Sequence, residues 1–89
     1  MQIEVFGTQD CSKCKSTQRK IQHFMNKLGV ADRVAFKFHD MDTVDGRTEG
    51  AFRDVFDIPT TIIQRDGQDV VRWSGIPPTA GIKEHLGTA

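Results

Sequence analysis

The chain contains only two cysteines, Cys11 and Cys14, and two residues separate them. A Cys-x-x-Cys pair can cycle between a dithiol and a disulfide, or it can supply two of the four ligands of a zinc site. The pair follows a short, apolar, β-prone segment, residues 3–6, and precedes an amphipathic helical pattern. A dithiol at such a strand-to-helix junction favours redox chemistry over metal binding.

The helical pattern after Cys14 consists of apolar residues at helical spacing and a glycine that predicts its end: Ile21, Phe24, Met25, Leu28 and Gly29. Steps of seven residues from Cys14 reach Ile21 and then Leu28, so we expect Cys14 to lie on the buried stripe. Cys11 lies one turn earlier, at the helix N-terminus, where free N–H groups and the helix dipole stabilise an anion. We therefore expect Cys11 to attack as a thiolate and Cys14 to resolve the resulting mixed disulfide.

Charged neighbours act on the same thiolate. Lys13 lies between the two cysteines and Lys15 directly follows them, whereas Asp10 directly precedes Cys11. The two lysines favour the thiolate and the aspartate opposes it. Reactive cysteines in such surroundings have pKa values lowered from about 8.5 to roughly 3.5–7.5. The sequence thus predicts that Lys13 and Lys15 help to lower the pKa of Cys11.

Metal binding is the alternative use of the cysteine pair. A structural zinc ion needs four protein ligands, and the chain has no second cysteine pair. The three histidines, His23, His39 and His85, match no common zinc spacing, and we expect all three at the surface. We therefore expect no metal site within one chain. A metal carrier in which two chains share one ion through Cys11 and Cys14 of each stays open.

The middle of the chain predicts a second strand and a second helix. Apolar and polar residues alternate from Val34 to His39, which indicates a strand. A strand, a helix and a second strand form a right-handed crossover, so the first two strands should be parallel. Residues 43–57 then predict a shorter helix, with Asp45 or Thr48 as its N-cap and four apolar residues at helical spacing: Ala51, Phe52, Val55 and Phe56.

The last third predicts a β-hairpin and a final helix. Residues 61–63 and 70–73 are β-prone, and Asp66 and Gly67 supply the turn between them. Gly75, Pro77 and Pro78 interrupt the second strand, and a short helix follows that buries Ile82 and Leu86. Residues 1–89 thus predict one α/β domain with the order βαβαββα, a four-stranded mixed sheet and three helices.

Composition narrows the expected partners and location. Twelve basic and twelve acidic side chains cancel, which disfavours nucleic acid as a partner. No apolar run approaches the roughly 18 residues of a membrane span, so we expect no membrane association. Residues 1–6 include Glu4 and lack the basic and apolar regions of a secretory signal. We expect a monomer in the cytoplasm. In that compartment cysteines stay reduced unless they are catalytic, sensing or metal-bound.

The element order, the Cys-x-x-Cys pair at the start of the first helix, and the Ile58-Pro59-Thr60 segment before the hairpin together resemble the thioredoxin superfamily. This resemblance covers nearly the whole chain. It implies that Pro59 is a cis-proline beside the dithiol and that the backbone of Ile58 binds the substrate chain as a strand. Without the resemblance, Pro59 could simply end a helix and begin an edge strand.

Within that superfamily the short first strand looks like glutaredoxin, and Trp73-Ser74-Gly75-x-x-Pro78 resembles the signature of NrdH-redoxins. These redoxins donate electrons to ribonucleotide reductase and are reduced by thioredoxin reductase. Residues 38–42 look more like thioredoxin, and the glutathione-binding elements of glutaredoxins are replaced around Pro59 and Gly75. Trp73 could equally be a core aromatic residue.

The sequence therefore predicts a thiol-disulfide oxidoreductase with no bound cofactor, whose redox group is the Cys11–Cys14 disulfide. We expect disulfide-containing proteins as substrates and thioredoxin reductase or a similar enzyme as reductant. The expected docking residues surround the dithiol: Ser12, Lys13, Ile58, Pro59, Trp73 and Gly75. A binding module that keeps this fold without a redox cycle is the remaining alternative.

Overall fold

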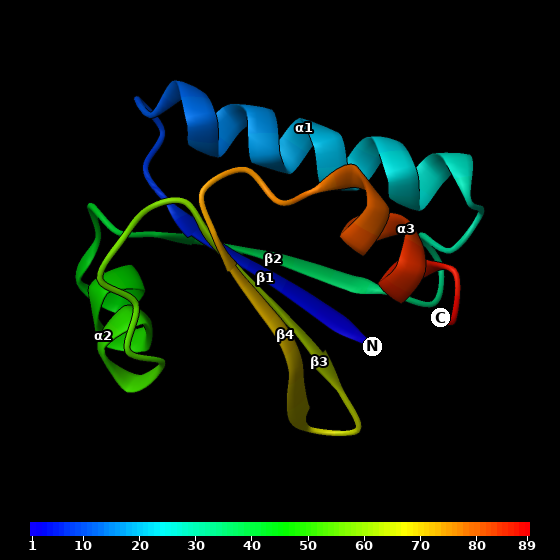
Figure 1. Cartoon of the computed structure of the whole chain (residues 1–89). Coiled ribbons are helices and arrows are strands. Elements are labelled where there is room, and N and C mark those ends of the chain that lie inside the picture. Colours follow the sequence, from blue (N-terminus) through cyan, green and yellow to red (C-terminus); the bar gives the residue numbers. More distant parts are fainter.

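A computed structural model describes residues 1–89, and its seven elements follow the expected order βαβαββα (Figure 1). They are β1 (Gln2–Gly7), α1 (Ser12–Lys27), β2 (Ala35–Asp40), α2 (Val44–Phe52), β3 (Thr60–Arg65), β4 (Gln68–Ser74) and α3 (Thr79–Leu86). The four strands form one sheet in the order β2-β1-β3-β4. β1 is parallel to β2 and antiparallel to β3, and β3 is antiparallel to β4. The predicted mixed sheet and parallel β1–β2 pair are confirmed.

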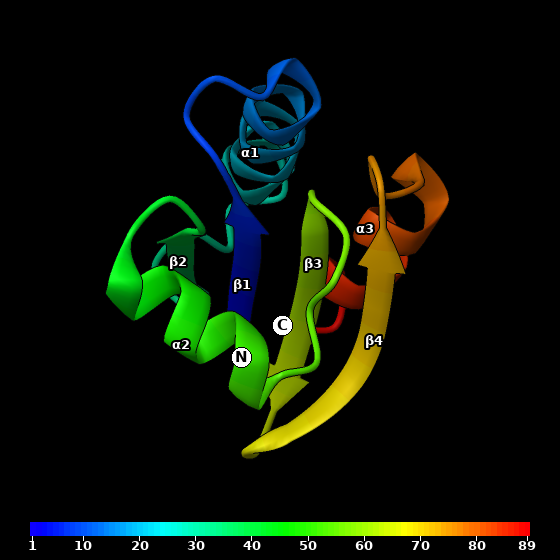
Figure 2. The ribbon, with the colours of Figure 1, turned by 90° about the vertical axis from the view of Figure 1, so that its left-hand side faces the viewer.

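The sheet separates two layers of helix. α1 and α3 pack on one face, and α2 lies on the other, next to β2 (Figures 1 and 2). Successive strand residues point to opposite faces, so neighbours on one strand enter different apolar clusters. Ile63 packs in the cluster below α1 and α3, whereas Ile62 packs with Phe6 and Val55 on the α2 side.

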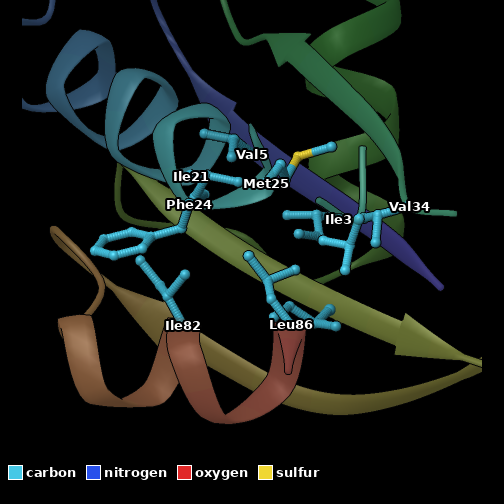
Figure 3. Close-up of a cluster of buried hydrophobic side chains, with 10 residues drawn as sticks. Ile3, Val5, Ile21, Phe24, Met25, Val34, Ile82 and Leu86 are labelled. Atoms are coloured by element: carbon cyan, nitrogen blue, oxygen red, sulfur yellow. The ribbon is translucent and has the colours of Figure 1, made fainter. Parts of the chain in front are cut away.

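The main core lies between the sheet and the two helices α1 and α3 (Figure 3). It contains ten buried residues: Ile3, Val5, Ile21, Phe24, Met25, Val30, Val34, Ile63, Ile82 and Leu86. The predicted burial of Ile82 and Leu86 on the last helix is confirmed. This cluster holds α1, and with it the dithiol, above β1.

The buried stripe of α1 stops before Leu28, which we had expected to continue it. Leu28 is the C-cap residue and is 39% exposed. Gly29 follows with φ of 68°, its N–H donates to the carbonyl of Asn26, and the N–H of Val30 donates to that of Met25. These two hydrogen bonds end the helix and turn the chain away from its axis, so Val30 enters the core in place of Leu28.

The second helix differs most from its prediction. It ends at Phe52 instead of residue 57, and its N-cap is Thr43, whose hydroxyl accepts from the N–H of Gly46, not Asp45 or Thr48. Its buried residues are Gly46 and Gly50. Phe52 and the following Phe56 are 80% and 87% exposed, so of the four apolar residues at helical spacing only Val55 is buried.

Charged side chains take the place of apolar packing beneath α2. Glu4 on β1 is buried, and its carboxylate pairs with the Nε2 atom of His39 at 3.0 Å and with the guanidinium of Arg53. Arg53 also pairs with Asp69 on β4 at 2.6 Å. His39 is only 5% exposed and stacks on Phe6, so the expected surface position of this histidine is wrong. The buried carboxylate on the neighbouring strand explains why a histidine is accommodated there.

Candidate functional site

Cys11 occupies the N-cap position of α1. Its backbone is extended, with φ of −83° and ψ of 114°, and its sulfur accepts the N–H of Cys14 at 3.1 Å. A sulfur in this position accepts hydrogen bonds from N–H groups of the first helical turn, which have no partner within the helix. The thiol hydrogen bond from Cys14 lowers the pKa of Cys11, and backbone N–H groups and the charge of Lys13 act in the same direction. The predicted lowered pKa of Cys11 therefore has a geometric cause.

Cys14 is fully buried one turn later in the chain. A Cβ atom built on Gly7 would lie 2.6 Å from its Sγ atom, so the thiol sits directly above the end of β1 and uses space that only glycine leaves free. Burial, followed by the hydrogen bond to Cys11 and the charge there, raises the pKa of Cys14 to about 11. The pKa values of the two thiols are thus shifted in opposite directions, although both thiols lie in one helical turn.

The cysteines are free thiols that lie near disulfide distance from each other. An exposed thiolate beside a protonated buried thiol can attack a disulfide first and close an internal disulfide second. No group of three or more histidine, cysteine, aspartate or glutamate side chains is arranged to hold a metal ion. The arrangement is therefore suited to disulfide exchange.

Pro59 lies at the start of β3, and the Ile58–Pro59 peptide bond is cis. Pro59 is buried, whereas Ile58 is 40% exposed. The carbonyl of Pro59 accepts the N–H of Gly75 at 2.8 Å, and Gly75 has φ of 81°. Two residues that the sequence placed in the docking surface, Pro59 and Gly75, are thus in direct contact through the backbone.

The other predicted docking residues lie in different surroundings. Ser12 and Lys13 are exposed in the first turn of α1, beside Cys11, and Lys15 is exposed one turn further. Trp73 packs under α3 instead, with its ring 5.8 Å from that of His85 and directly below Gly81. This contact gives Trp73 the core position that was its alternative interpretation, and its part in docking stays a prediction.

One contact of the site region was not anticipated from the sequence. The Nζ atom of Lys20 on α1 donates to the carbonyl of Pro77 at 2.8 Å. The bond joins the dithiol helix to the loop between β4 and α3, which also contains Gly75. A lysine in the middle of an amphipathic helix gives no signal for such a bond, because its partner is a backbone carbonyl 57 residues away.

The fold and the site define a class of protein: a dithiol at the N-terminus of a helix and a cis-proline directly before β3, on a mixed four-stranded sheet. The chain matches the family described as "Thioredoxin domain" over residues 1–87, and it belongs to that family. Among curated protein sequences, none is significantly similar to this chain. None of its helices has the length and apolar character needed to cross a lipid bilayer.

Solved thioredoxin structures resemble the fold. Thioredoxin 1 of Thermosipho africanus has 26% identity and a TM-score of 0.72 over 99% of this chain and 89% of its own. The thioredoxin of Fasciola hepatica has 23% identity and a TM-score of 0.76, over 98% of this chain and 78% of its own. Oxidised mitochondrial thioredoxin 3 of Saccharomyces cerevisiae has 22% identity and a TM-score of 0.76, over 99% and 77%. These comparisons establish the thioredoxin-like fold.

Proposed function

We propose that this protein is a small thiol-disulfide oxidoreductase that reduces disulfide bonds in other proteins. The observation that carries the proposal is the different placement of its two cysteines, which shifts their pKa values in opposite directions. Cys11 has a lowered pKa at the helix tip, and Cys14 is buried with a pKa of about 11. The thiolate is the attacking species in disulfide exchange, so Cys11, whose pKa is the lower of the two, is the attacking thiol.

The proposed reaction has two exchange steps. The Cys11 thiolate attacks one sulfur of the substrate disulfide, a Cys11–substrate bond forms, and the other substrate sulfur leaves and takes up a proton. Cys14 then loses its proton and attacks Cys11, which releases the second substrate thiol and leaves the Cys11–Cys14 disulfide. Two electrons pass from the cysteine pair to the substrate, and of the two protons that the substrate thiols take up, Cys14 releases one and the solvent supplies the other. An external dithiol reductant must then reopen the internal disulfide.

The first step prepares the second. Three effects raise the pKa of Cys14, and two of them, the thiol hydrogen bond and the negative charge, come from Cys11. Both are lost once the Cys11 sulfur is bonded to the substrate and carries no charge. Their loss lowers the pKa of Cys14 in the mixed disulfide, whereas burial, the largest cause, continues to raise it.

We assign substrate docking to the surface beside Cys11. Ile58 would offer its exposed backbone to an extended substrate segment next to Pro59, and Ser12, Lys13 and Gly75 would border the same segment. The support is the contact of Pro59 with Gly75 and the exposure of Ile58. The resemblance of the Trp73–Pro78 segment to NrdH-redoxins further suggests ribonucleotide reductase as an electron acceptor. We also propose that the chain works as a single-domain monomer in the cytoplasm, without a bound cofactor.

Insulin reduction with dithiothreitol tests the roles of the two cysteines. We expect Cys11→Ser to abolish the catalysed rate, because it removes the attacking thiolate. Cys14→Ser should form a stable mixed disulfide with the substrate, whereas Cys11→Ser should form none. Full activity of Cys11→Ser, or no catalysis by the wild type, contradicts the proposal and favours a binding module.

The reductant is tested separately. Oxidised protein is incubated with NADPH and thioredoxin reductase, and in parallel with NADPH, glutathione and glutathione reductase, while NADPH consumption is followed. The NrdH-like assignment predicts turnover with thioredoxin reductase. Turnover only with glutathione would reject that assignment, although it would leave disulfide reduction itself intact.

A further inference from the structure

The outer face of α2 exposes large apolar side chains to solvent. Val44 and Phe52 are 70% and 80% exposed on the helix, and Phe56 is 87% exposed in the segment that follows. Val44, Ala51 and Phe52 also line one open hollow of about 530 Å³. We call Val44, Ala51, Phe52 and Phe56 the α2 strip. The hollow falls in the roughly 300–1,000 Å³ range of ligand clefts, so it has room for apolar side chains of a partner.

The helix is built so that these side chains must point outward. Gly46 and Gly50 are the residues that face the sheet. A Cβ atom on Gly46 would lie 1.8 Å from the carbonyl oxygen of Asp40, and one on Gly50 would lie 2.6 Å from the Cε atom of Met41. Glycine inside a helix costs roughly 0.5–1 kcal/mol relative to alanine. The helix therefore lies close to the sheet through its smallest residues and presents its largest apolar residues to solvent.

The charge around the α2 strip has one dominant sign. Four acidic residues in residues 44–58 are exposed: Asp45, Glu49, Asp54 and Asp57. Arg47 is the one exposed cation in that stretch, because the guanidinium of Arg53 is already paired with Glu4 and Asp69. Asp45 and Glu49 line the neighbouring hollow toward β2, whereas Arg47 is the one charged residue that lines the α2 hollow itself. The excess of acidic side chains beside the strip therefore complements an apolar surface with a basic rim.

The α2 strip is connected to the dithiol at both of its ends. At its start, the N–H of Met41 donates to the carbonyl of Gly7, which ties the loop before α2 to the end of β1 below Cys14. At its end, Phe56 precedes Ile58 and Pro59 by two and three residues. Figure 2 shows α2 running away from the end of the sheet where β3 starts, and the segment after α2 turning back toward the start of β3. A partner that covers the end of the strip at Phe56 would therefore lie on the segment that leads to Ile58 and Pro59.

We propose that the α2 strip docks an amphipathic, lysine- and arginine-rimmed helix of the disulfide-bearing partner protein. This inference rests on the proposed function, because it assigns part of that partner's recognition to α2. A second copy of this chain fits less well. In a twofold arrangement the same acidic patch would be present on both sides of the interface, and an excess of like charge across an interface opposes association.

Three synthetic peptides test the proposal. Each carries the same intramolecular disulfide; one continues into a leucine-lysine amphipathic helix, one into a leucine-glutamate helix, and one ends after the disulfide. The second-order rate constant for oxidation of the reduced protein is measured with each. We expect the lysine peptide to react about 10-fold faster than the short peptide, because apolar burial and charge attraction add to its docking. The glutamate peptide should show no such gain.

Matched variants locate the effect. Phe52→Ser with Phe56→Ser should reduce the ratio between the lysine peptide and the short peptide to about one. Leu28→Ser serves as control, because Leu28 is an exposed apolar residue at the opposite end of the fold from the dithiol, at the C-cap of α1. It should keep the 10-fold ratio. Circular dichroism confirms that each variant is folded.

The outcomes separate the two proposals. Equal rates for the lysine and short peptides, or equal gains from lysine and glutamate, overturn the docking inference. A dimer on gel filtration that Phe52→Ser dissociates also overturns it, since a second copy then covers the strip. If no peptide oxidises the protein, the proposed function fails. Fluorescence anisotropy with cysteine-free versions of the two helical peptides then still decides the inference, because preferential binding of the lysine version supports it and equal binding rejects it.

Discussion

The two faces of the sheet are built by different forces. Below α1 and α3, ten apolar side chains form one buried cluster, whereas the α2 side has a buried apolar cluster of three: Phe6, Val55 and Ile62. The α2 side instead uses the contacts of the Glu4 carboxylate with the His39 ring and the Arg53 guanidinium. Apolar packing on the first face excludes water from Cys14 and keeps it protonated. Directional contacts on the second face leave the apolar residues of α2 available for a partner.

The charge network also holds the segment that leads to the cis-proline. The guanidinium of Arg72 on β4 donates to the carbonyls of Arg53 and Asp54. Asp54 has φ of 53°, a left-handed conformation that only a minority of non-glycine residues adopt. Side chains from β1 and β4 thus hold the turn after α2 in place. This turn then positions the segment that leads to Ile58 and Pro59.

The largest expected contrast concerns the two thiols on the α1 face. At pH 7 a thiol with a pKa of about 11 is ionised in about 1 molecule in 10,000. Cys11 has a lowered pKa, so its thiolate forms at lower pH than that of an ordinary cysteine. We expect iodoacetamide to label Cys11 at least about 100-fold faster than Cys14 at pH 7, measured by peptide mass spectrometry.

The same labelling tests the role of Lys13. Its positive charge contributes to the lowered pKa of Cys11, so Lys13→Gln should move the midpoint of the rate-versus-pH curve to higher pH. Lys27→Gln is the control, since Lys27 lies in the last turn of α1, far along the helix from Cys11. Comparable labelling of both cysteines at pH 7 would contradict the division into an attacking and a resolving thiol.

The next contrast concerns stability and compares a large apolar residue on each face. Ile63 is 1% exposed in the α1/α3 cluster, whereas Phe52 is 80% exposed on α2. Ile63→Ala should lower the free energy of unfolding by about 3 kcal/mol, through lost burial and a cavity. Phe52→Ala should change it by less than about 0.5 kcal/mol, as surface substitutions do. Urea denaturation measures both, and a large loss for Phe52→Ala would mean that α2 depends on its outer face for stability.

The first face could be predicted from the sequence because its signals are local. The spacing from Cys14 to Ile21 fixes the buried side of α1, and the thiol asymmetry follows from position within one helical turn. Ile82 and Leu86 likewise lie one turn apart on α3. Leu28 is the exception, since the turn at Gly29 ends the helix before the periodic pattern does.

The second face could not be predicted in the same way. Apolar residues at helical spacing normally indicate the buried side of a helix, yet Phe52, which belongs to such a pattern, is exposed. Its exposure follows from a backbone contact outside the helix, because Gly46 packs against the carbonyl of Asp40 and leaves no room for larger side chains on that face. The pairing of Glu4 with His39 and Arg53 joins residues 35 and 49 positions apart. Glycine and buried charge carry little periodic signal.

The smallest expected effects distinguish the two glycines beneath α2. Alanine is favoured over glycine in a helix by roughly 1 kcal/mol, so either substitution would stabilise a free helix. At Gly50 the new Cβ atom meets the end of the flexible Met41 side chain, which can move aside. At Gly46 it meets the backbone carbonyl of Asp40, which cannot move without shifting α2 or the end of β2.

We therefore expect Gly50→Ala to be neutral or slightly stabilising, whereas Gly46→Ala should lower the free energy of unfolding by about 1–2 kcal/mol. Urea denaturation of both variants, with the wild type as reference, gives the sign of each change. Equal effects of the two substitutions would show that α2 does not lie against the sheet through Gly46. The outward direction of Val44 and Phe52 would then lack its structural cause, because it depends on that close approach.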